Sequence, residues 1–138
     1  MEFQVAKEKA IKYVFVAKKT EYEVRTKLKR IGCDEEVINK VILFLKDYKY
    51  IDDNDYIDAY LRQNMRLLKY SIYEIKQKLL QKGINKCIIE EKLQNFKKTN
   101  YENLAIEKIT IAKSKIMDEI KLKQYLYRRG FVKSDFEN

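Results

Sequence analysis

Four aspartates crowd residues 50–63 (YIDDNDYIDAYLRQ): Asp52, Asp53, Asp55 and Asp58. Grouped carboxylates are the ligands that Ca²⁺ and Mg²⁺ prefer in proteins. An EF-hand loop starting at Asp52 needs glycine at its sixth position and glutamate at its twelfth, but those positions hold Ile57 and Gln63. A magnesium site would need carboxylates from a second segment, and no comparable acidic group occurs elsewhere in the sequence. The pattern therefore favours a helix start, with Asp53 or Asn54 as the N-cap of a helix beginning near Asp55.

Other catalytic arrangements lack the residues they require. The sequence has no histidine and three isolated glycines, so it contains no ordinary catalytic triad, no GxxxxGK[ST] phosphate loop and no GxGxxG turn. Cys33 and Cys87 are too few for a zinc cluster, and we expect both to be small, reduced core residues. The sequence predicts no enzyme, no cofactor and no metal site.

Composition favours helices and an anionic partner. The 138 residues include no proline, which together with the few glycines predicts an all-α fold. A net charge of +9 suits nucleic acids, acidic protein surfaces or anionic membranes, although a biased genome would also enrich lysine. The N-terminus MEFQVAKEKA has no apolar leader, and no uninterrupted run of apolar residues is long enough to span a membrane. We therefore expect a cytoplasmic protein.

Three helices are predicted in the first 50 residues. Apolar residues at helical spacing indicate a helix over residues 3–18. Thr20 and Glu23 form a capping-box pattern that starts a second helix, which runs to about Ile31 and is ended by Gly32. A third helix over residues 34–47 begins with three acidic residues and carries an apolar stripe.

This pattern recurs twice. A shift of 51 residues aligns Thr20 with Ser71 and Gly32 with Gly83, together with the apolar stripe between them. A shift of 47 carries Gly83 to Gly130 and places Asp118 at the N-cap of a third copy. Leading helices are expected at about 55–69 and 103–115. We predict tandem three-helix (helix-turn-helix-like) repeats in an elongated, curved array: 1–53, 54–101 and 102–138, the last incomplete after FVKSDFEN.

Charge distinguishes the helices within each repeat. The helix over residues 34–47 carries net charge −2, so it is unsuited to enter a DNA groove as the second helix of a helix-turn-helix would. The middle helices, 20–31, 71–82 and 118–129, each carry +2. Basic residues of these helices and of the second leading helix are the predicted partner- or DNA-binding residues, with a merely solvated face as the alternative: Arg25, Lys29, Arg30, Arg62, Arg66, Lys76, Lys78, Lys82, Lys121, Lys123, Arg128 and Arg129.

Eleven tyrosines raise the alternative of base stacking. Tyr13, Tyr56 and Tyr60 lie on or beside apolar stripes, where a core role is the ordinary interpretation. Tyr48, Tyr50 and Tyr70 are the better candidates for contact with a partner.

Several of these segments together carry a family signature. YIDDNDYIDAYLRQ, KYSIYEIKQKLLQKGI and YLYRRGF resemble the RecX family, regulators of the bacterial recombinase RecA, over nearly the whole chain. The signature positions are Asp52, Asp53 and Tyr56, then Ala59 and Tyr60, then Ile75, Leu79, Gly83 and Ile84, and finally Arg129, Gly130 and Phe131. Ser71 stands where many members carry glycine, and it supplies an N-cap.

The resemblance implies a non-enzymatic protein of tandem three-helix repeats that lies in the groove of the RecA–DNA filament. Family members usually restrain strand exchange, ATP hydrolysis and co-protease activity in DNA repair and the SOS response. The expected partners are therefore the RecA filament and, weakly and without sequence preference, single- or double-stranded DNA, contacted by a monomer. A stand-alone DNA-binding module and a scaffold for another acidic partner remain as alternatives.

Overall fold

Eight α-helices make up the described part of the chain, residues 1–132 of this computed structural model, and no strand occurs within it. The first three are α1 (Phe3–Val16), α2 (Glu21–Arg30) and α3 (Glu35–Asp47). They are followed by α4 (Asp53–Leu67), α5 (Ile72–Gln81) and α6 (Lys86–Lys97), and then by α7 (Tyr101–Lys113) and α8 (Glu119–Arg128). The predicted all-α class is confirmed.

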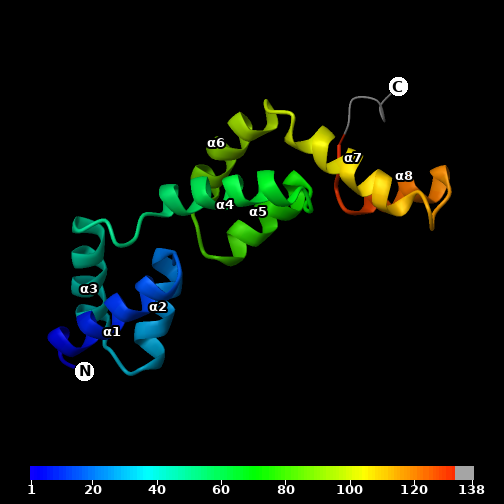
Figure 1. Ribbon diagram of the computed structural model, residues 1–138. Coiled ribbons are helices and arrows are strands. Elements are labelled where there is room, and N and C mark those ends of the chain that lie inside the picture. Colours follow the sequence, from blue (N-terminus) through cyan, green and yellow to red (C-terminus); the bar gives the residue numbers. More distant parts are fainter. Residues whose placement is uncertain (133–138) are drawn as a thin grey trace.

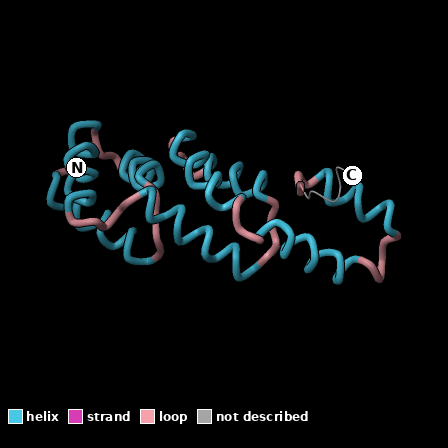
Figure 2. The backbone as a smooth tube through the Cα atoms, turned by 90° about the horizontal axis from the view of Figure 1, so that it is seen from above, coloured by secondary structure: helices cyan, strands magenta, loops and turns pink. Residues whose placement is uncertain are grey.

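The helices form a bent, elongated array (Figure 1). Viewed along a perpendicular direction, the molecule is again elongated, with the N-terminal helices toward one end and the C-terminal helices toward the other (Figure 2). In Figure 1 the middle helices α2 and α5 lie on the inner side of the bend, whereas α3 and α6 lie on its outer side. The predicted elongated array of three-helix repeats is confirmed. The exact boundaries 1–53, 54–101 and 102–138 stay a prediction, and residues 133–138 of the last one lie outside the described residues.

The middle helices start and stop as the sequence predicts. Thr20 and Ser71 each complete a capping box with the glutamate three residues later. Asp118 caps α8 by accepting from the Lys121 amide. Positive φ angles at Gly32, Gly83 and Gly130 end these helices in the conformation that glycine adopts at least cost.

Some predicted helix ends need correction. The leading helices α4 and α7 start and end two residues earlier than predicted, and α1 ends at Val16 because Ala17 is already extended. The N-cap of α4 is Asp52, whose carboxylate accepts from the amides of Asn54 and Asp55. Asp53 cannot serve as the cap because it lies inside the helix and binds the preceding repeat.

The apolar residues form two separate cores. One core belongs to α1, α2 and α3 and includes Val24, Leu28 and Val41. The other runs without interruption from α4 to Phe131, so the second and third repeats share it. Cys33 is buried in the first core as predicted, but Cys87 is exposed because it lies in the first turn of α6, outside its apolar stripe.

Candidate functional site: repeat junctions and a basic inner side

The acidic segment serves the fold, with each carboxylate bound to its own partner. Asp53 accepts a hydrogen bond from the Glu21 amide at 3.0 Å, and burial raises the pKa of this carboxyl. Asp55 pairs with Lys18 of the first repeat, and Asp58 pairs with Lys92 at 2.8 Å. Within residues 1–132, no three histidine, cysteine, aspartate or glutamate side chains gather as a metal site would require.

The junction between the first two repeats joins the start of α2 to the end of α5. The buried Thr20 hydroxyl donates to the Lys82 carbonyl oxygen at 2.7 Å, while it also accepts from the Glu23 amide. The Lys82 ammonium lies 3.3 Å from the Glu23 carboxylate. Tyr22 packs against Gly83 so closely that a Cβ atom on the glycine would lie 2.2 Å from the tyrosine ring. The capping box and the glycine stop therefore meet across the repeats.

The second junction has the same arrangement as the first, but an arginine that makes several hydrogen bonds takes the place of the lysine. The buried Ser71 hydroxyl donates to the Arg129 carbonyl oxygen at 2.6 Å, and Tyr73 packs against Gly130. The Arg129 guanidinium donates to both carboxylate oxygens of Glu74 and to the Lys69 carbonyl. Burial alone would raise the pKa of Glu74, but hydrogen bonds from Arg129 and from the Ser71 amide outweigh burial and hold it below its usual value.

Arg129 should contribute more to stability than its counterpart Lys82. We expect Arg129→Gln to lower the free energy of unfolding by about 1.5–3 kcal/mol, because it removes charge-assisted hydrogen bonds from a side chain that is only 20% exposed. Lys82→Gln should cost at most about 1 kcal/mol, since the Lys82 side chain is 46% exposed and makes a single ion pair. Urea unfolding of both variants measures the difference, and equal losses would contradict this assignment.

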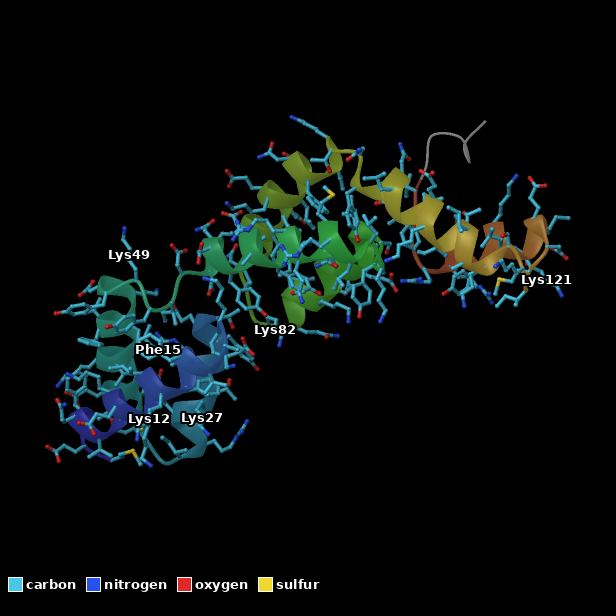
Figure 3. The ribbon with its side chains drawn as sticks, in the orientation of Figure 1. Lys12, Phe15, Lys27, Lys49, Lys82 and Lys121 are labelled. Atoms are coloured by element: carbon cyan, nitrogen blue, oxygen red, sulfur yellow. The ribbon has the colours of Figure 1, made fainter. Side chains whose placement is uncertain are left out.

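The other predicted binding residues fall into two groups, those that form an ion pair with a carboxylate and those that do not. Arg25, Lys76 and Lys123 pair with Glu21, Glu90 and Glu119 within their own repeats. Within residues 1–132, seven of the predicted residues make no ion pair: Lys29, Arg30, Arg62, Arg66, Lys78, Lys121 and Arg128. Figure 3 shows Lys27 on α2 and Lys82 at the end of α5. The structure assigns Lys82 and Arg129 to the junctions, and binding by the other predicted residues stays a prediction.

Sequence reasoning missed a group of lysines that lie over tyrosine rings. Lys19 and Lys27 lie over Tyr13, and Lys69 and Lys78 lie over Tyr70. Tyr13 is partly buried as predicted, and Tyr70 proves to be half-buried, unlike the exposed Tyr48. Spacing within one helix could not reveal the contacts of Lys27 and Lys78, because each joins a middle helix to the segment before it.

A cleft of about 610 Å³ between the second and third repeats has no catalytic arrangement among its described residues. Its charged lining includes the Lys76–Glu90 ion pair and Glu102, whose carboxylate accepts from the Val132 amide at 2.6 Å. Burial raises the pKa of Glu102. In the described part of the chain, no helix is both long enough and apolar enough to cross a membrane.

The fold and the junctions define the chain as an all-α tandem-repeat protein whose repeats interlock from capping box to glycine stop. Comparison with known families gives the more specific assignment. The family model described as "RecX, first three-helix domain" matches residues 6–45, and the model described as "RecX, second three-helix domain" matches residues 52–93. The chain belongs to the RecX family of regulatory proteins.

Individual relatives agree with this assignment. Regulatory protein RecX of Clostridium beijerinckii is 38% identical over 91% of this chain and 60% of its own length. That of Caldanaerobacter subterraneus is 33% identical over 99% of this chain and 70% of its own length. The crystal structure of RecX from Lactobacillus salivarius superposes with a TM-score of 0.81 at 26% identity, covering 98% of this chain and 92% of that one. The chain spans about three fifths of the length of several curated relatives.

Proposed function

We propose that this protein regulates the bacterial recombinase RecA by binding the RecA–DNA filament along its groove, without catalysing a reaction itself. The observation that carries the proposal is the bent array, whose basic middle helices line its inner side while the acidic α3 lies on the outer side (Figure 1). The family relationship supports a regulatory role. The protein acts in the cytoplasm as a monomer and restrains recombination, ATP hydrolysis and co-protease activity.

A repeating array suits a repeating partner for a physical reason. A filament presents the same acidic or phosphate groups at regular intervals, so several weak contacts on one rod add through effective concentration. Lys29, Arg30 and Arg128 are exposed on the middle helices and make no ion pair in residues 1–132, so their charges are available to a partner. Their binding energy is electrostatic and falls as salt rises.

The direct test is to titrate the protein into the DNA-dependent ATPase assay of the cognate RecA, with binding to bare DNA measured in parallel. We expect the wild type to lower ATP hydrolysis and to bind RecA-coated DNA more tightly than bare DNA. Tighter binding to bare DNA, with unchanged ATP hydrolysis, would instead favour a stand-alone DNA-binding protein. That result would contradict the proposed regulation.

Charge reversal on the inner side tests the proposed surface. We expect Lys29→Glu, Arg30→Glu and Arg128→Glu together to weaken filament binding at least about 100-fold, because each change replaces an attraction with a repulsion. The matched control reverses Lys40, Lys86 and Lys97 on the outer helices α3 and α6. It changes the net charge equally and should leave most of the affinity. Equal losses in both variants would mean that net charge, not this surface, determines binding.

A further inference from the structure

Each repeat contains one tyrosine whose ring is covered by two basic side chains. We call these three groups the tyrosine–lysine clusters. In the first, the ammonium groups of Lys19 and Lys27 lie 4.8 and 5.5 Å from the centre of the Tyr13 ring. In the second, those of Lys69 and Lys78 lie 5.4 and 4.5 Å from the centre of the Tyr70 ring. In the third, Lys113 and Arg129 flank Tyr125 at 5.5 and 5.6 Å.

One position of each cluster recurs in register along the chain. The shifts of 51 and 47 residues align Lys27 with Lys78 and with Tyr125 on the three middle helices. In the third repeat the two residue types are exchanged, since the tyrosine lies on α8 and Lys113 comes from the leading helix α7. The rings of the first two clusters do not align either, because Tyr13 lies on α1 and the shift of 51 pairs Tyr70 with Lys19. Each repeat therefore has a cation–ring contact at its middle helix, but the ring comes from a different position each time.

The lysines of the clusters are held in place and free to bind an anion. Within residues 1–132, none of them forms an ion pair with a carboxylate, whereas the nearby Glu23 and Glu74 are engaged at the junctions. A lysine ammonium has three donors, so contact with a ring leaves donors that face solvent. Because the ring restrains the lysine side chain before binding, less conformational entropy is lost when an anion arrives.

We propose that the tyrosine–lysine clusters bind phosphate groups of one nucleic-acid strand, at one position per repeat. This inference rests on the proposed function, which it extends by naming the contact points. A nucleic-acid strand carries an anion on every nucleotide, so it can offer a phosphate to each cluster, whereas carboxylates on a protein surface would have to match the spacing of the clusters. A single strand suits the bent array better than a duplex, because a duplex is stiff over about 50 nm.

The binding test replaces one lysine per cluster, Lys27→Gln, Lys78→Gln and Lys113→Gln, and leaves the junction residue Arg129 intact. Binding to a fluorescently labelled oligothymidylate is followed by anisotropy at several salt concentrations. Each phosphate contact with a single strand contributes about 0.7 to the slope of log affinity against log salt, so the slope should fall by about 2. The control Lys40→Gln, Lys86→Gln and Lys97→Gln loses the same charge and should keep the wild-type slope.

A second variant tests the rings. Tyr13→Leu, Tyr70→Leu and Tyr125→Leu keep all charges but remove the surfaces that restrain the lysines. We expect about a 2- to 5-fold loss of affinity for the oligothymidylate with an unchanged salt slope, as expected from weak exposed cation–ring contacts. Thermal melts of every variant, followed by circular dichroism, confirm that the proteins compared are folded. Wild-type affinity in both cluster variants would overturn the inference.

The RecA ATPase assay, run on the same samples, separates this inference from the proposed function. If the wild type lowers ATP hydrolysis but the lysine variant binds the oligothymidylate normally, the clusters are not phosphate sites and the proposed function stands. If the lysine variant loses its effect on RecA without losing the strand, the clusters contact protein, and the inference fails. If strand binding depends on the clusters but the wild type does not affect RecA, the inference holds and the proposed function fails. Tighter, cluster-dependent binding to duplex would overturn the choice of a single strand.

Discussion

Gly83→Ala should destabilise the protein by about 2–4 kcal/mol, combining the strain of a left-handed backbone with a forced contact. The φ angle of Gly83 is +77°, and a Cβ atom there would lie 2.2 Å from Cγ and 2.3 Å from Cβ of Tyr22. Neither of these atoms is the far end of a flexible side chain, so the first repeat would have to move away from the second. Urea unfolding measures the loss.

Gly32→Ala is the matched control for this substitution. Gly32 occupies the same position in the first repeat with a φ angle of +98°, but a Cβ atom there would meet nothing within 4 Å. Only the backbone strain remains, and its cost is about 1–2 kcal/mol. A loss of stability in Gly32→Ala as large as in Gly83→Ala would show that the contact across the junction does not matter.

Leu79→Ala should lower the free energy of unfolding by about 2–5 kcal/mol, the usual cost of emptying a fully buried leucine site. Leu79 is 0% exposed and lies in the core that the second and third repeats share. The control Leu43→Ala removes the same atoms from a side chain that is 61% exposed, and it should change stability by less than about 0.5 kcal/mol. Indistinguishable urea midpoints for wild type and Leu79→Ala would contradict the core assignment.

The sequence predicted the helices well because their signals are local. The capping boxes at Thr20 and Ser71 and the glycine stops recur at a fixed period, and each depends only on neighbours within one turn. The predicted start of α4 was two residues too late, because Asp53, which resembles a cap in sequence, instead accepts a hydrogen bond from the Glu21 amide of the preceding repeat. No local pattern contains that information.

The candidate site was less accessible to prediction for the same reason. Charge along the middle helices predicted a basic binding side, but spacing alone gave Lys82 and Arg129 the same role as Lys29. Their carboxylate partners lie 59 and 55 residues away in the chain. The repeated tyrosine and glycine positions carried a signal, since Tyr22 and Tyr73 recur as Gly83 and Gly130 do, but their pairing becomes visible only when the repeats are placed in contact.

The shared hydroxyls of Thr20 and Ser71 restrict which residues these two positions can hold. In each, one oxygen atom accepts from an amide of its own helix and donates to the last turn of the next middle helix. An aspartate would serve equally well at an ordinary helix start, yet its ionised carboxylate has no proton to donate. Serine and threonine are therefore interchangeable here in a way that aspartate is not, because an aspartate would cap its own helix but leave the last carbonyl of the next middle helix without its donor.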